Sequence, residues 1–133
     1  MTSPTKELQG AIYDRLRLNA NVIAAVGSQI YDQVPDSAGF PRITFGPKDL
    51  VPENFECIVG NRITVQIDVW AREPGMAVDE IAEIVRVALL TVDVTLTVNA
   101  VATFELRNIV FLDDPDGLTK HAAMYFEVFV EQP

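Results

Sequence analysis

The clearest structural signal in this sequence is RITVQIDVW, residues 62–70. Every second residue from Ile63 to Val69 is apolar, and the residues between them are polar. Because successive side chains of a β-strand point to opposite faces, this alternation places one side of the strand on a core. Such a pattern is typical of an antiparallel sheet with one solvated face. Trp70 is then expected on the face away from the core.

A second long strand is predicted from about Lys120 to Glu131. Its even-numbered residues from Met124 to Val130 are apolar, so they are expected to form the buried side. Tyr125 and Phe129 fall on the opposite side. The two strands together predict a sheet that has apolar residues on both faces.

Shorter strands are predicted at residues 40–46, 94–98 and 104–111, with an extended piece at 30–35 that ends at a proline. In the stretch 104–111 the apolar residues change parity near Asn108, which indicates a β-bulge with one extra residue. Residues 47–60 contain prolines and charged residues without a period. They predict either a long loop or a loose hairpin.

Two amphipathic helices are predicted, one near the N-terminus and one at residues 76–92. Ser3 and Pro4 are residue types preferred at a helix start. A third, short helix is predicted between these two helices, and it ends at Gly27. The apolar stripe of the 76–92 helix is wider than one sheet face requires, because Ile84 and Val87 extend it.

The predicted order is helix, short helix, two strands, helix and three strands, which indicates an α+β fold. We expect a mostly antiparallel sheet of about four to five strands with two main helices packed on one face. The length predicts a single domain that spans residues 1–133.

The chain has 133 residues, a formal charge of −9 and 49% hydrophobic residues. This apolar content argues against a disordered acidic tail. The negative charge and the scattered arginines argue against a protein that reads DNA, since phosphate binding needs clustered basic residues. One cysteine, Cys57, excludes an internal disulfide, and the longest apolar stretch is too short and too charged to span a membrane. We therefore expect a soluble cytoplasmic protein.

The sequence predicts no catalytic, cofactor or metal site. Cys57 and His121 are the only residues of their types, but no flanking motif supports a Cys–His pair. The acidic run 113–116 superficially resembles a calcium loop, yet it lacks the glutamate that completes an EF-hand. We interpret it as a tight turn in which Gly117 adopts a positive φ.

Apolar side chains outside the predicted core are the stronger signal. They are Trp70 on the first strand, Ile84 and Val87 on the long helix, and Tyr125 and Phe129 on the last strand. Each one alone is ordinary, because single apolar residues are common on protein surfaces. Together they predict a covered surface, either through self-association or through a second layer formed by residues 47–60.

Several short segments, in a fixed order, resemble the tail-completion or tail-to-head joining proteins of long-tailed bacteriophages and prophages. They cover nearly the whole chain and are Leu8–Tyr13 with Leu16, Val26-Gly27, Ile30–Pro35, Phe40-Pro41 with Gly46, Val69–Arg72 with Gly75, and Asp114–His121. The last segment is the most distinctive. The sequence departs from the family at Arg42, where an aromatic residue is more frequent, and at Ala71, where a serine is usual.

The resemblance implies a non-enzymatic virion protein that forms a ring, typically sixfold, at the head-proximal end of the tail tube. Its expected partners are further copies of itself, the tail tube protein and the head connector proteins, and DNA passes through without specific binding. The expected location is the virion tail, and the host cytoplasm during assembly. The segment from Asp114 through Asp116 and Gly117 to Thr119 is then a structural turn, held by side-chain to backbone bonds.

Two alternatives remain open. Small ring proteins of head–tail assemblies share sizes and folds, so the chain could be another connector component, such as a stopper or an adaptor. A small α+β ligand-binding domain is the second alternative, and it requires a pocket with converging polar groups. Residues 47–60 are the candidate docking segment for the tail tube or the connector.

Overall fold

The computed structural model describes residues 2–133, and Met1 of the predicted domain lies outside the described residues. Within this range the chain forms three helices and a five-stranded sheet. In chain order the elements are α1 (Pro4–Leu18), α2 (Ala20–Val26), β1 (Ile30–Tyr31), β2 (Arg42–Pro52), β3 (Val59–Arg72), α3 (Val78–Leu90), β4 (Ala100–Asp113) and β5 (Thr119–Gln132).

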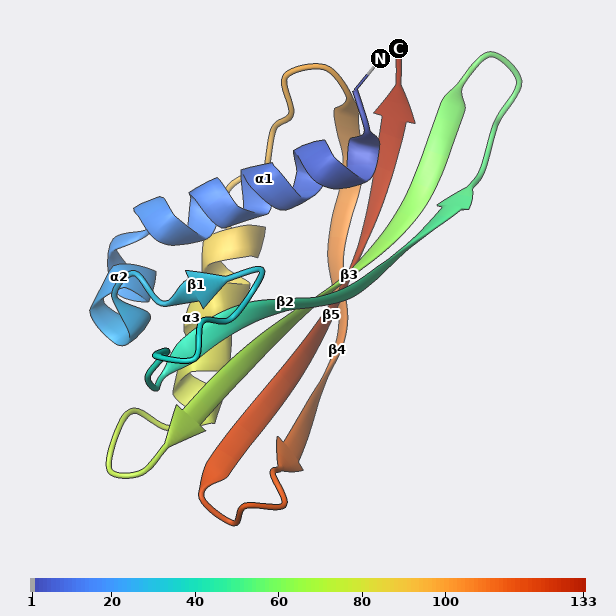
Figure 1. Cartoon of the computed structure of the whole chain (residues 1–133). Helices are drawn as coiled ribbons and strands as arrows, with labels where there is room; N and C mark the ends of the chain where they lie inside the picture. Colours follow the sequence, from blue (N-terminus) through green and yellow to red (C-terminus); the bar gives the residue numbers. More distant parts are fainter. Residues whose placement is uncertain (1) are drawn as a thin grey trace.

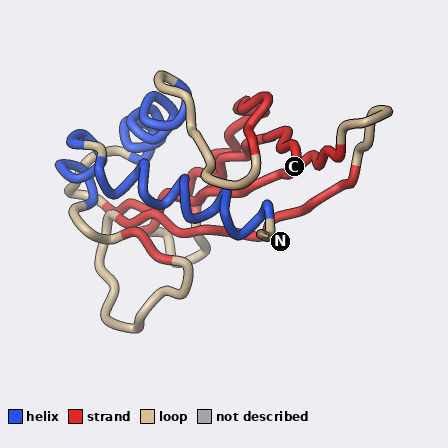
Figure 2. The backbone as a smooth tube through the Cα atoms, turned by 90° about the horizontal axis from the view of Figure 1, so that it is seen from above, coloured by secondary structure: helices blue, strands red, loops and turns tan. Residues whose placement is uncertain are grey.

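The sheet has the strand order β1-β2-β3-β5-β4. The short β1 pairs with β2 in parallel, and every other pair is antiparallel. The α+β prediction is confirmed, and the sheet is mixed rather than purely antiparallel because of β1. Figures 1 and 2 show the helices on one face of the twisted sheet. The other face carries no helix among residues 2–133, and we call it the open face.

Local sequence accounts for the start of α1 and for both ends of α2. Ser3 caps α1, with its Oγ accepting from the Lys6 amide, and Pro4 is the first helical residue. The side chain of Asn19 caps α2 by accepting from two backbone amides. Gly27 ends α2 with φ 63°, a conformation that costs glycine little. All these starts and stops follow from short-range capping chemistry.

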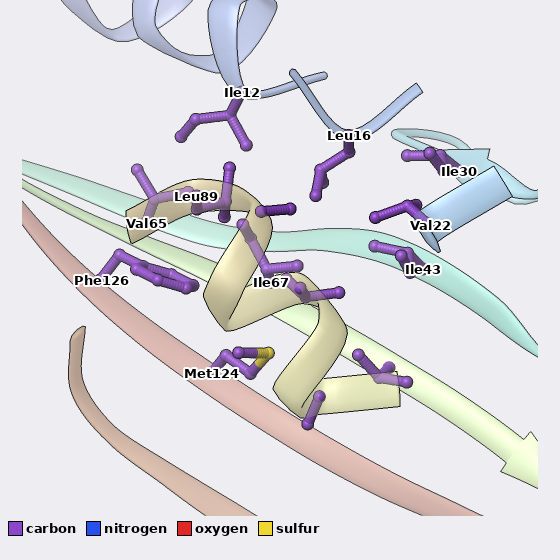
Figure 3. Close-up of a cluster of buried hydrophobic side chains, with 14 of the residues drawn as sticks. Ile12, Leu16, Val22, Ile30, Ile43, Val65, Ile67, Leu89, Met124 and Phe126 are labelled. Atoms are coloured by element: carbon purple, nitrogen blue, oxygen red, sulfur yellow. The ribbon is translucent and has the colours of Figure 1, made fainter. Parts of the chain in front are cut away.

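The core lies between the helices and the inner face of the sheet. Leu8, Ile12 and Leu16 repeat at helical spacing on α1 and are fully buried. They face the alternating apolar side chains of β3 and β5, of which Phe126 is the largest (Figure 3). The predicted apolar stripe of α3 is buried too, and its members are Val78, Ile81, Ala82, Val85, Ala88 and Leu89.

The segment 47–60 is a hairpin, the second of the two predicted forms. β2 continues to Pro52 and β3 already begins at Val59, with a register shift between Phe45 and Lys48. We call residues 48–61 the β2–β3 arm. Its turn lies at the end of the sheet away from α2 and α3 (Figure 1).

The predicted strand at 94–98 is wrong, since β4 begins only at Ala100. Two side chains of α1 hold this segment instead. The carboxylate of Glu7 accepts from the amides of Val98 and Asn99, each at 2.9 Å. The guanidinium of Arg15 donates to the carbonyls of Val92 and Asp93 at 2.9 and 2.8 Å. Side chains from the helix therefore satisfy backbone groups that a sheet partner would otherwise bind.

β4 is an edge strand that pairs only with β5. Its register shifts between Leu106 and Asn108, which confirms the predicted bulge, and shifts a second time between Val101 and Thr103. Among residues 2–133 no helix has the length and apolar character needed to cross a membrane.

Candidate assembly surfaces

Trp70 lies on the open face and is engaged within its own chain. Its Nε1 donates to Thr44 Oγ1 at 2.9 Å, and its ring stacks on His121 with centroids 3.8 Å apart and planes 10° apart. His121 Nε2 lies 2.7 Å from Asp68 Oδ1, and Gln66 donates to the same oxygen at 2.9 Å. The buried Asp68 thus has partners on two strands. Trp70 packs against a polar cluster on the open face that consists of Gln66, Asp68 and His121.

Phe129 is covered by the tip of the β2–β3 arm. Its ring centroid lies 5.9 Å from that of Phe55. The ring also lies over Gly60, where a Cβ atom would come within 2.3 Å of Phe129 Cζ. This close approach requires a residue without a side chain. The arm is therefore a second layer over this end of the open face.

An ion-pair network holds the arm in place. Arg62 contacts Glu53 of the arm at 2.7 Å, and it also bonds to Glu127 of β5. The bonds to Glu53, and then those to Glu127, raise the pKa of the Arg62 guanidinium. Arg107 of β4 lies 3.4 Å from the second Glu127 oxygen. Three strands are thus linked across the open face by pairs that the sequence pattern did not reveal.

The candidate Tyr125 lies in the middle of the open face, where it is half-buried. It is paired across the strands with Gln66 of β3 and Asn108 of β4. The candidates Trp70, Tyr125 and Phe129 therefore share one face. Trp70 and Phe129 lie at opposite ends of this face, and each has an aromatic partner within the chain.

Ile84 and Val87 belong to a different surface, a groove between α2 and α3. Ile84 is half-buried against the core, whereas Val87 is 47% exposed. The groove has a volume of about 350 Å³, and its walls are formed by Asn19, Asn21, Met76, Glu80, Glu83, Ile84, Val87 and Ala88. We call it the α2–α3 groove. Its floor is apolar, and its charged wall residues are both glutamates.

The turn between β4 and β5 is a network of local bonds. Asp116 Oδ1 accepts from the amides of Leu118 and Thr119 at 2.8 Å, and its Oδ2 accepts from Thr119 Oγ1 at 2.7 Å. Asp114 Oδ1 accepts from the Asp116 amide, and Gly117 has φ 73°. These bonds, led by the Thr119 hydroxyl, lower the pKa of Asp116 to about 2. Arg72 of β3 joins the network through Asp116 and Thr119.

Phe40 lies between two guanidinium groups at the start of β2. The Arg42 and Arg72 side chains lie 4.2 and 4.1 Å from its ring centroid. Arg42 Nε is buried and has no hydrogen-bond partner among residues 2–133. In the sequence, Arg42 stands out only as a departure from the family pattern. The aromatic contact it makes with Phe40 could have been anticipated only from their closeness in sequence.

The residues considered for catalysis and metal binding lie apart. Cys57 is exposed in the arm turn, whereas His121 pairs with Trp70 near the other end of β3. At roughly 3.3 Å per strand residue, these ends are tens of ångströms apart. Among residues 2–133, no group of three or more His, Cys, Asp or Glu side chains is arranged to hold a metal ion.

A cavity of about 1040 Å³ lies between α1 and the segment 91–97. Three of its charged residues already have partners within the chain. Glu7 binds the amides of Val98 and Asn99, Arg15 binds backbone carbonyls, and Asp14 pairs with Arg17 at 2.9 Å. The accepted bonds, led by that from the Asn99 amide, lower the pKa of Glu7. These groups hold the fold together and do not converge on the cavity.

The fold occurs in a solved virion. A chain in a structure described as the virion of a native gene transfer agent particle superposes with a TM-score of 0.87 and 23% sequence identity. The match covers 98% of the present chain and 99% of the other chain. At this identity the likeness establishes a shared fold of a virion component. No curated protein matches the chain in sequence.

A family model identifies the chain more narrowly. The model described as tail completion protein gp17 matches residues 10–131. The chain therefore belongs to this tail completion family. It is a structural protein of phage-type virions, as the resemblance in the sequence implied.

Proposed function

We propose that this protein completes the phage tail and joins it to the head by forming a closed ring of identical subunits, typically six, at the head-proximal end of the tail. The main support for this proposal is that the chain belongs to the tail completion family. In the proposed ring each subunit contacts its neighbours through two different surfaces, because only such heterologous contacts close into a ring. Assembly takes place in the host cytoplasm, and the finished protein resides in the virion tail.

The surface chemistry of the chain supports this role. Large apolar side chains are exposed on the arm, on the helix flank and on β4, and examples are Phe55, Val87 and Phe111. Exposed apolar groups at several separate places are typical of a protein with several contacts. The candidate interface residues on the helix flank, Ile84 and Val87, line one such surface.

The arm is the proposed docking segment for the tail tube protein or the head connector. Its tip exposes Phe55 and Ile58, which are 52% and 43% exposed, beside Glu53 and Glu56. The contacts of Phe55 with Phe129 and of Glu53 with Arg62 hold this tip in a defined position. Docking therefore requires little ordering of the chain at the moment of contact.

The net charge fits a conduit for DNA. With −9 charges per subunit, a ring repels phosphate groups and lets DNA pass without gripping it. A basic lumen in the assembled ring would contradict this part of the proposal. The alternative role, a stopper or adaptor of the same connector, predicts the protein in completed heads rather than at the end of tails.

The test is negative-stain microscopy of tails made with and without the protein. The proposal predicts that tails lacking it are over-long or fail to join heads, and that added protein restores joining. Labelled protein should be located at the head-proximal tail end. Tails of normal length that join heads in its absence would refute the role, and label on tail-less heads would favour the stopper or adaptor.

A further inference from the structure

The exposed end of β4 presents an apolar ridge on both sides of an edge strand. Val110, Phe111 and Leu112 are 37%, 51% and 48% exposed. Phe111 pairs with Ala122 and lies on the helix-bearing face, beyond the cover of α3, whereas Val110 and Leu112 lie on the open face. We call Arg107 and residues 110–112 the β4 ridge. Its strand has a free edge, because β4 pairs only with β5.

The ridge and the α2–α3 groove differ in charge. Arg107 is the only charged residue between Glu105 and Asp113, and its side chain is 58% exposed. Its Nε lies 3.4 Å from Glu127 of the same chain, so the charge of the guanidinium is partly balanced. The charged residues that line the groove are Glu80 and Glu83. Glu80 forms no ion pair among residues 2–133, and Glu83 lies 3.5 Å from Arg86. An apolar ridge that carries one exposed arginine and an apolar groove lined by two glutamates thus occur on the same chain.

The two surfaces lie on opposite sides of the subunit. The strand order puts β1 and β4 at the two edges of the sheet, and α2 lies near β1 (Figure 1). Helical spacing puts Ile84 and Val87 on the flank of α3 that faces α2, while Arg86 and Leu90 lie on the flank toward β4. A subunit therefore cannot insert its ridge into its own groove.

From this arrangement we propose that the β4 ridge of one subunit inserts into the α2–α3 groove of a second copy of this chain. Phe111 contacts Val87 and Met76 in the groove, and Arg107 pairs with Glu80. The contact is head-to-tail, since each copy offers its ridge to one neighbour and its groove to the other. This inference rests on the proposed ring and specifies which surfaces close it.

Paired cysteines test the contact in assembled tails. In a Cys57→Ser background, Val87→Cys and Phe111→Cys in one chain should give a ladder of covalent oligomers with a short bis-maleimide. Each single variant should give no dimers, because Val87 meets Phe111 and never another Val87. Dimers from a single variant would indicate a two-fold contact and overturn the proposal. The control pair is Val34→Cys with Phe111→Cys, since Val34 is 45% exposed and does not line the groove.

Charge reversal provides a second test that does not depend on cross-linking. Glu80→Arg and Arg107→Glu should each weaken incorporation into tails by about tenfold or more, through loss of one charge pair and a new repulsion. When both changes are made in one chain, most of the incorporation into tails should be restored. Incorporated protein that gives neither a ladder nor this rescue overturns the inference and leaves the ring intact. Absence of the wild-type protein from tail ends overturns the proposed function, and the inference with it.

Discussion

Trp70 and His121, the only tryptophan and the only histidine of the chain, stack face to face on the open face with their ring centroids 3.8 Å apart. Beneath them the buried carboxylate of Asp68 binds the imidazole at 2.7 Å. The stack joins β3 to β5, and the bond from Trp70 to Thr44 extends it to β2. One aromatic pair therefore ties three strands of the sheet together.

His121→Ala should destabilise the protein, because it leaves Asp68 with one side-chain partner fewer in a buried position. We expect a loss of about 1–3 kcal/mol in the free energy of unfolding, measured by urea titration. The emission of Trp70 should shift to longer wavelength in the folded variant as water reaches the indole. Unchanged emission and stability would show that the stack is absent in solution. His121→Gln, which keeps a donor near Asp68, should lose less.

Asp116→Asn should lower stability at neutral pH and have little effect in strong acid. The pKa of Asp116 is lowered from 3.8 to about 2 in the folded chain, first by the bonds from Thr119. Its contribution is therefore present above pH 3.8 and is lost as the pH falls through about 2. Unfolding curves between pH 7 and pH 2 should show the two proteins converging at the acid end. Asp36→Asn, in an exposed loop, is the matched control and should show no such convergence.

Gly60→Ala should be destabilising although it adds only one methyl group. Its Cβ would lie 2.3 Å from Phe129 Cζ and 2.6 Å from the Glu53 carbonyl oxygen, so the arm tip must move. We expect a loss of about 1–3 kcal/mol in thermal or urea unfolding. Gly10→Ala is the control, because nothing lies within 4 Å of its Cβ position on the surface of α1. That change should raise the free energy of unfolding by about 0.5–1 kcal/mol.

Glu7→Ala should release the segment that precedes β4. Its carboxylate accepts from the amides of Val98 and Asn99, and these donors lose their acceptor in the variant. Hydrogen exchange should become faster at these two amides by about tenfold or more, while exchange in β5 stays unchanged. Lys6→Ala, on the adjacent exposed position, should leave both amides protected. Equal protection in wild type and Glu7→Ala would mean that other groups hold the segment.

Elements decided by local pattern were predictable from the sequence. The alternation in β3 and β5 fixed which side chains are buried, and the parity change near Asn108 correctly indicated a bulge. The caps at Ser3 and Gly27 follow from chemistry within a few residues. In each case the information lies close together along the chain.

Features decided by distant contacts were not predictable. The segment 94–98 has the alternation of a strand, but Glu7 and Arg15 of α1 bind its neighbouring backbone. The arm had two predicted forms, and its fold depends on Phe129 and Arg62. The sequence pattern does not distinguish among the candidate interface residues. The structure separates them into an open face with intrachain partners and a helix flank with an exposed groove.

The position of β5 in the sheet determines when the sheet can be completed during translation. It lies between β3 and β4, and all residues from Thr119 to Gln132 pair with β3. While residues up to 118 are being synthesised, β3 and β4 have no strand between them, and the sheet exists as two unjoined parts. Only the emergence of this last strand unites them. The β4 edge is therefore completed only after residues 119–132 are available to pair with β3 and β4.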